Sequence, residues 1–156
     1  MGLRLKFNLV LVIVFLAGFA AAGGISRQLL QANARDEVVR NARLMMEAAI
    51  SVRTYTINQI QPHLVKQMNE VFLPQTVPAY AATEAIHQLQ KTYPDYGYKE
   101  ATLNPTNPRD RAADWEADLV QEFRQHDALK ELVSERQAST GRSLFIAKPI
   151  KITNPA

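Results

Sequence analysis

Side chains that commonly act in catalysis or metal binding are few in this sequence, and their spacing favours structural roles. The three histidines, His63, His87 and His126, match no local metal-binding spacing such as i, i+4. Four acids between residues 110 and 118 lie at an expected helix start, where the helix dipole favours negative charge. A glycine-rich phosphate loop, a nucleophile elbow and an HExxH motif are all absent. We therefore expect no catalytic residue, no metal-binding residue and no enzymatic activity.

Sulfur chemistry is restricted to methionine, because the sequence contains no cysteine. These 156 residues can form neither a disulfide, nor a thiolate metal site, nor a covalent bond to c-type haem. Met45 and Met46 lie in a long predicted helix, where they are either core residues or, alternatively, soft ligands for a haem iron. The net charge of +3 is spread over mixed acidic and basic residues, a pattern that does not indicate nucleic-acid binding.

The N-terminal 25 residues carry a long apolar stretch. Residues 7–25 contain no charged residue and are long enough to cross a hydrocarbon core. A signal peptide cleaved after Ala20-Ala21-Ala22 is one interpretation. We favour an uncleaved signal anchor, because helix-favouring sequence continues past the apolar stretch. Arg4 and Lys6 precede it, and a short basic tail usually stays cytoplasmic, although four arginines between residues 27 and 43 follow on the other side. We expect residues 1–6 to be a cytoplasmic tail, 7–25 to be the transmembrane anchor and 26–156 to be an extracytoplasmic domain.

Apolar periodicity, proline and glycine divide the remaining sequence into elements. A long helix is expected from Ser26, as its N-cap, to Gln61, and Pro62 is expected either to kink this helix or to start a new one. Arg43 and Glu47 are spaced for an ion pair on its surface. The elements expected after it are a short amphipathic helical piece over 64–71, a helix over 78–91, a strand over 96–103, a helix over 111–125 capped by Asp110, and a hairpin of strands over 129–137 and 142–152.

Residues 96–108 are the centre of this organisation. Alternation places Tyr98 and Glu100 on one side of the predicted strand and Lys99 on the other. The prolines and asparagines that follow predict a stiff loop. This loop is either a simple turn or one wall of a ligand pocket, and in the second case Asn104, Pro105 and Asn107 are the candidate pocket residues.

The predicted fold class is α+β, with a transmembrane helix that runs into a long helix, followed by an antiparallel sheet with flanking helices. Gly141 supplies the turn of the hairpin, and Leu144 and Ile146 share one face of its second strand. Three strands on one helical layer leave sheet edges open. The chain also stops directly after a predicted strand, so we expect the domain to be incomplete at its C-terminus.

Five segments together resemble a known family. They are Ala42–Met45, Arg53–Thr56, Phe72–Tyr80, Tyr93–Tyr96 and Lys99–Pro108, the last being the most specific. The sequence is similar, over Ala34 to Ala156, to the membrane-anchored, PAS-like c-type haem sensor domain of cyanobacteria and proteobacteria, long catalogued as a domain of unknown function. Members often precede a histidine kinase, a cyclase or a chemotaxis output, and some stand alone.

The resemblance implies a PAS-like antiparallel sheet of five strands and a c-type haem in a complete member. In the family, the strand equivalent to 144–152 leads to a Cys-x-x-Cys-His motif, which in this sequence is expected where the chain ends at Ala156. This chain as it stands is thus expected to hold no cofactor. The distal iron ligand of the family lies on the long helix, which implies Met45 or Met46 here, and the loop with Asn104, Pro105 and Asn107 is implied to shape the haem pocket.

Three hypotheses on function follow. The first is a single-pass sensor and signal-transduction module of the inner membrane, with a periplasmic domain, lipid as its surroundings and a kinase-type protein as its output. The second is a domain that binds a small ligand without haem. The third is an interaction protein that forms a homodimer through the long helix.

Overall fold

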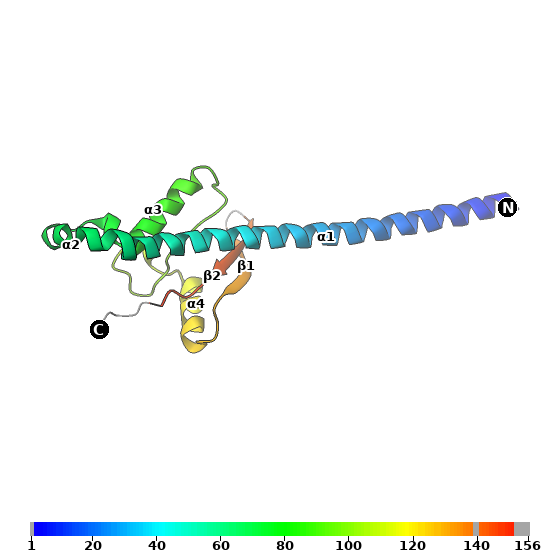
Figure 1. The fold of residues 1–156 in the computed structure, drawn as a ribbon. Coiled ribbons are helices and arrows are strands. Elements are labelled where there is room, and N and C mark those ends of the chain that lie inside the picture. Colours follow the sequence, from blue (N-terminus) through cyan, green and yellow to red (C-terminus); the bar gives the residue numbers. More distant parts are fainter. Residues whose placement is uncertain (1, 139–140, 152–156) are drawn as a thin grey trace. The chain divides into compact units, whose positions relative to one another are not determined.

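The computed structural model describes residues 2–138 and 141–151. Its fold is α+β, as predicted, and Figure 1 shows its elements in chain order. The elements are α1 (Leu3–Tyr55), the π-helix η1 (Thr56–Ile60), α2 (Gln61–Glu70), the 3-10 turn η2 (Pro74–Thr76), α3 (Pro78–Gln90), the 3-10 turn η3 (Pro108–Asp110), α4 (Asp114–Gln125), β1 (Leu132–Ala138) and β2 (Gly141–Ala147). The chain forms two compact units, Met1–Arg40 and Asn41–Ala156.

In the first unit, residues 3–40 are helical throughout and belong to α1. The large apolar side chains between Phe7 and Ile25 are exposed, which is unfavourable in water and favourable in lipid. At 1.5 Å per residue, residues 7–25 form a stretch about 28 Å long, close to the thickness of a hydrocarbon core. This helix is long and apolar enough to cross a membrane by length and composition.

Pro62 stands at the start of a new helix, α2, which is one of the two outcomes predicted for it. The π-helix η1 precedes the proline, and the Gln61 amide donates to the Thr56 carbonyl in an i to i−5 bond. Pro62 then occupies the first turn of α2, where a missing amide hydrogen leaves no bond unmade. Thr56 is buried, and its hydroxyl donates to the Val52 carbonyl at 2.8 Å. The helical path therefore continues to Glu70 instead of ending at Gln61.

The core of the second unit lies between α1 and α3. Ala49 on α1 and Ala82 on α3 are fully buried and Ile86 is nearly so. The side chains of Met45, Val52 and Tyr98 pack against them. A methyl group on each side lets two helix backbones approach closely. Helix α3 itself agrees with the prediction, since Pro78 stands in its first turn and the helix ends at Gln90.

The predicted strand over 96–103 is wrong, because these residues form no ladder. Their only β-type pairing is a parallel bridge between Thr102 and Arg111, in which the Thr102 amide donates to the Asp110 carbonyl and the Ala112 amide to the Thr102 carbonyl, both at 2.9 Å. A strand needs a partner strand, and among the described residues segment 96–103 pairs through this single bridge. The described sheet therefore has two strands, where three were predicted.

Helix α4 begins at Asp114, three residues later than predicted, and Asp110 does not cap it. Asp110 ends the turn η3, which is capped by Asn107. The Glu116 carboxylate accepts from the Ala113 amide at 2.8 Å and so satisfies one of the free donors at the helix start.

The hairpin is confirmed, with shorter strands than predicted. Residues 129–131 and 148–151 lie outside β1 and β2, and Ile152 lies outside the described residues. Gly141 has a φ of 124°. The register pairs Glu135 with Leu144 and Val133 with Ile146, so Leu144 and Ile146 do share a face. On the other face Trp115 of α4 contacts Phe145, with ring centroids 5.2 Å apart, and the Arg136 guanidinium lies 4.2 Å from the Trp115 centroid.

Candidate functional site

A nearly buried cluster of three polar side chains joins α1 to segment 96–103. The loop that follows this segment, residues 104–108, is called the proline loop below. Arg53 of α1 donates to Oε2 of Glu100, and the Tyr98 hydroxyl donates to Oε1 of the same carboxylate at 2.9 Å. Only 16% of the Arg53 side chain and 11% of the Glu100 side chain are exposed. The alternation predicted for this segment is thus correct although no strand forms, since Lys99 turns the other way and pairs with Glu116 at 2.5 Å.

Burial and the Glu100 carboxylate raise the pKa of the Tyr98 phenol, and the Arg53 charge opposes them with a smaller effect. Burial of the ring raises the pKa of Tyr98 above its ordinary value of 10.0, and the Glu100 charge and hydrogen bond raise this pKa further. Tyr98 therefore stays a neutral donor at physiological pH. A group with a raised folded pKa contributes stability below its unfolded value and loses it as pH rises, so this contribution fades only above about pH 10. The cluster is fixed electrostatically, with one cation, one anion and one neutral donor.

A second group of charges ties α1 to the two ends of the hairpin. The Arg43 guanidinium donates to Oε1 of Glu131 at 2.9 and 2.7 Å, and Lys148 contacts both Glu47 and, at 3.7 Å, Glu131. The predicted Arg43–Glu47 pair is therefore wrong: each residue pairs with the hairpin segment instead of with its neighbour on the helix. Long-range partners prevail because the hairpin ends bring opposite charges to this face of α1.

The Arg43 hydrogen bond lowers the pKa of Glu131 below its ordinary value of 4.5, with smaller contributions from the charges of Arg43 and Lys148 and an opposing one from burial. A depressed carboxyl pKa contributes stability above pH 4.5, and this is lost as pH falls through the folded value. The cluster is thus intact at neutral pH. Because Arg43 is half exposed, its contribution to stability is small.

Met45 and Met46 differ in their surroundings. Met45 packs against Ala49, Ala82 and Ile86, so its side chain is part of the core. Met46 is half-buried. In the described residues no group of three or more His, Cys, Asp or Glu side chains is placed to hold a metal ion. A role for either methionine as an iron ligand stays a prediction.

The proline loop is held mainly by its own backbone and by Arg109. Asn104 and Asn107 are exposed and Pro105 is half-buried. The Asn107 side chain accepts from the Arg109 amide at 3.2 Å. Arg109 reaches α3, where it donates to Glu84 at 3.0 Å and lies 5.1 Å from the Tyr80 ring centroid. The loop is thus anchored to α3, and its role in lining a pocket stays a prediction.

Two hollows lie along the long helical path. The first, of about 320 Å³, is lined by Gln61, Met68, Phe72, Leu73, Thr76, Val77 and Pro78. The second, of about 360 Å³, is an open depression on the surface of α1 and η1 lined by Ile50, Ser51, Thr54, Tyr55, Asn58 and Gln59. Neither contains Met45, Met46 or a residue of the proline loop.

A known protein family matches most of this chain. The model of the Tll0287-like family matches residues 31–156, which include the whole second unit. The chain belongs to the Tll0287-like family. Tll0287 is a c-type haem sensor-like domain, which agrees with the resemblance found in the sequence. No curated protein and no solved structure matches the chain.

The residues of this Tll0287-like chain do not fit a covalently attached haem. Such attachment uses the two cysteines and the histidine of a Cys-x-x-Cys-His motif, and residues 1–156 contain no cysteine. Two of the three histidines lie beside carboxylates: His87 of α3 is 3.8 Å from Glu84, and His126, directly after α4, is 3.2 Å from Glu122. His63 is exposed on α2. Residues 1–156 of this Tll0287-like sequence therefore cannot form the covalent attachment of a c-type haem.

Two features of this Tll0287-like domain were missed by the sequence analysis. Arg53 and Glu100 are 47 residues apart, and only the placement of Glu100 beside Tyr98 on one side of an alternating segment hinted at a shared partner. Gln61 was assigned to a helix end. Two features of the sequence point to a contact of Gln61 with segment 74–78: Pro62 directly follows Gln61, and prolines flank the segment.

Proposed function

We propose that this Tll0287-like chain is a membrane-anchored sensor module, with residues 7–25 as an uncleaved anchor and residues 26–156 as an extracytoplasmic domain. The observation that carries the proposal is the continuity of α1. This one helix contains the exposed apolar stretch and also Ala49 and Val52, which pack in the core of the second unit. A change in that core acts on the same helix that enters the lipid.

The contacts along α1 suggest how a signal is transmitted. Arg43 and Glu47 hold the hairpin ends, and Arg53 holds Glu100 and, through it, Tyr98. A ligand or a redox event that shifts segment 96–103 or the hairpin changes the forces on three positions of α1. Such a coupling requires that the two states differ in these contacts.

The proposal includes three partners. Lipid surrounds the anchor, a second copy pairs through α1, and a kinase-type protein receives the signal. Leu44 and Tyr55 support the pairing, because both are large apolar residues of α1 that stay exposed in the second unit. The role is one of binding and signalling and not of catalysis. A haem-independent ligand-binding domain is the second candidate, and the hollow beside Gln61 favours it.

The anchor is tested by the mass of the chain that stays in membranes. After an alkaline carbonate wash, the chain is expected in the membrane pellet with an intact mass of 17.5 kDa, the mass of all 156 residues. The matched control is the variant Ala20→Leu/Ala22→Leu, which removes the small-residue cleavage site and is expected to give the same behaviour with only the added side-chain mass. A shorter wild-type product that begins after Ala22, and is restored to full length in the control variant, would show a cleaved signal peptide instead.

A further inference from the structure

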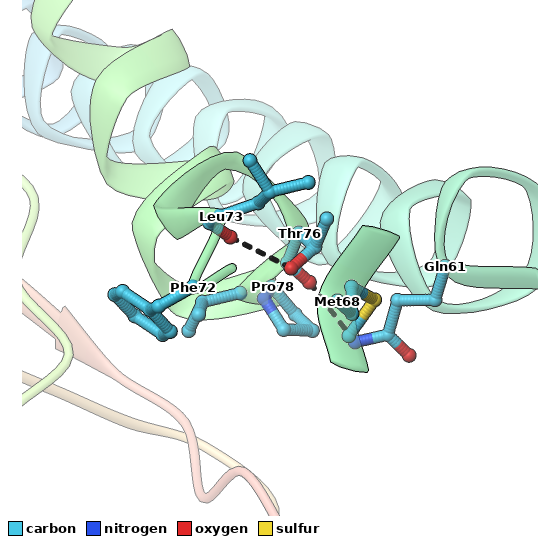
Figure 2. A pocket seen from close by; sticks show the side chains of 7 residues that line it. Gln61, Met68, Phe72, Leu73, Thr76 and Pro78 are labelled. Atoms are coloured by element: carbon cyan, nitrogen blue, oxygen red, sulfur yellow. Dashed lines mark hydrogen bonds between the residues drawn. The ribbon is translucent and has the colours of Figure 1, made fainter. Parts of the chain in front are cut away.

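The first hollow is built from α2, which directly follows the π-helix η1, and from the proline-flanked segment after α2. The wider turn of η1 ends at Ile60, and Gln61 follows with its amide bonded to the Thr56 carbonyl. Figure 2 shows Phe72 and Gln61 at opposite ends of the hollow, with Pro78 between them. A π-helix inside a longer helix is frequently found at functional sites. The volume of the hollow, about 320 Å³, lies at the small end of the range for ligand pockets.

The rim of this hollow is held rigidly. Thr76 is buried, and its hydroxyl donates to the Leu73 carbonyl at 2.7 Å. The Thr76 carbonyl in turn accepts from Nε2 of Gln61 at 2.9 Å, and both bonds are drawn in Figure 2. Pro74 and Pro78 stiffen the segment on either side. The Gln61 amide is thereby oriented, because its NH₂ group is used by Thr76 and its Oε1 remains as an acceptor.

The chemistry of the lining restricts the ligand. The lining residues other than Gln61 and Thr76 are all apolar, and none of them carries a charge. A charged ligand would lose its hydration without gaining a partner. The oriented Oε1 of Gln61 accepts a hydrogen bond, so a matching ligand carries an O–H or N–H donor. The thioether of Met68 and the ring of Phe72 both make favourable contacts with aromatic rings, so the lining favours an aromatic ligand.

Several apolar side chains at the edge of the hollow are exposed. Phe72 is 76% exposed and Val71 is 56% exposed, and Met68 is also exposed. Phe72 follows the end of α2 and stands in an irregular segment before η2. Phe72 therefore lies outside any helix or strand. Packing of its ring against a bound molecule removes apolar surface of the ring and of the molecule from water.

We propose that this hollow binds a small, neutral aromatic molecule with one hydrogen-bond donor, of the phenol class, which donates to Oε1 of Gln61. The ligand's ring lies among Met68, Phe72 and Pro78, and its O–H reaches Gln61. This inference rests on the proposed sensor function and gives it a ligand class. Binding joins α2 to segment 72–78 and so acts on the helical path that continues from α1.

The test uses the full chain in lipid nanodiscs, labelled with ¹³C at the methionine methyl groups, and phenol and anisole as probes. The Met68 methyl signal, assigned from a Met68→Leu variant, is expected to shift on addition of phenol. The Met45 and Met46 signals are expected to stay, because these residues lie outside the hollow. Phenol is expected to bind about fivefold more tightly than anisole at equal free concentration, since anisole lacks the donor and one net hydrogen bond has this order of effect.

Three variants sharpen the test. Val77→Trp fills the hollow and is expected to abolish the Met68 shift, whereas Val65→Trp, at an exposed position of α2 outside the lining, is expected to preserve it. Gln61→Leu is expected to bind phenol and anisole equally. Far-UV circular dichroism and the ligand-free Met68 signal verify the fold of each variant.

Equal binding of phenol and anisole by the wild-type chain, an unmoved Met68 signal, or phenol binding by folded Val77→Trp would each overturn the proposal. These outcomes are separable from a failure of the sensor proposal. A full-length anchored chain that ignores phenol refutes this site alone, and a cleaved chain that binds phenol refutes the anchor alone.

Discussion

A chain in which Ile13 and Leu16 are both replaced by arginine is expected to be lost from carbonate-washed membranes. Both residues are exposed apolar side chains near the middle of the apolar stretch of α1. An arginine at the centre of a membrane-spanning helix costs about 3 kcal/mol on insertion scales, and the lost apolar side chain adds a few tenths. The double change therefore disfavours insertion by about 6 kcal/mol. The measurement is the distribution of the chain between pellet and supernatant by immunoblot.

The matched control for this change is Leu44→Arg/Val65→Arg. It adds the same two charges at exposed apolar positions of the second unit, outside the apolar stretch. We expect this variant to stay in the pellet like the wild-type chain. If Ile13→Arg/Leu16→Arg also stayed in the pellet, another part of the chain would be responsible for membrane association.

Replacement of Arg53 by methionine is expected to lower the stability of the second unit by about 3 kcal/mol. The change leaves the Glu100 carboxylate nearly buried, with the Tyr98 hydroxyl but without its cation. For a domain of this size the loss corresponds to a decrease in Tm of roughly 10 °C. The measurement is thermal unfolding of the full chain in nanodiscs, followed by circular dichroism.

Two further variants separate the buried pair from charge effects in general. Arg142→Ala removes one ion-pair partner of Glu135, but the Arg142 side chain is largely exposed, so we expect a loss below about 0.5 kcal/mol. The double variant Arg53→Met/Glu100→Leu removes both buried charges and is expected to recover most of the lost stability. If Arg53→Met and Arg142→Ala had the same effect, Arg53 and Glu100 would not form a desolvated pair in solution.

The helices and the hairpin were predictable because their determinants are local. Pro78 sets the start of α3, apolar periodicity sets the course of α1, and Gly141 allows the turn between β1 and β2. The strand over 96–103 failed for the opposite reason. Alternation is a local property, and it correctly placed Tyr98 and Glu100 on one side, but a strand also needs a partner elsewhere in the chain.

The polar contacts were much less predictable than the elements. The partner of Glu100 is 47 residues away, and the partner of Arg43 is 88 residues away. Sequence spacing on a helix favoured Arg43–Glu47, a pair worth a few tenths of a kcal/mol, and such a weak preference yields to a better-placed partner. The π-helix at Thr56 had only Pro62 as a signal, and proline usually indicates a kink or a helix start.

The central claim, an anchored chain with its folded domain outside the cytoplasm, is tested most directly by cysteine labelling. The sequence has no cysteine, so Thr106→Cys and Leu3→Cys each create a single thiol, at exposed positions in the proline loop and before the apolar stretch. With a membrane-impermeant maleimide, we expect Thr106→Cys to be labelled in intact cells and Leu3→Cys to be labelled only after lysis. Labelling of Leu3→Cys in intact cells, with Thr106→Cys protected until lysis, would contradict the account.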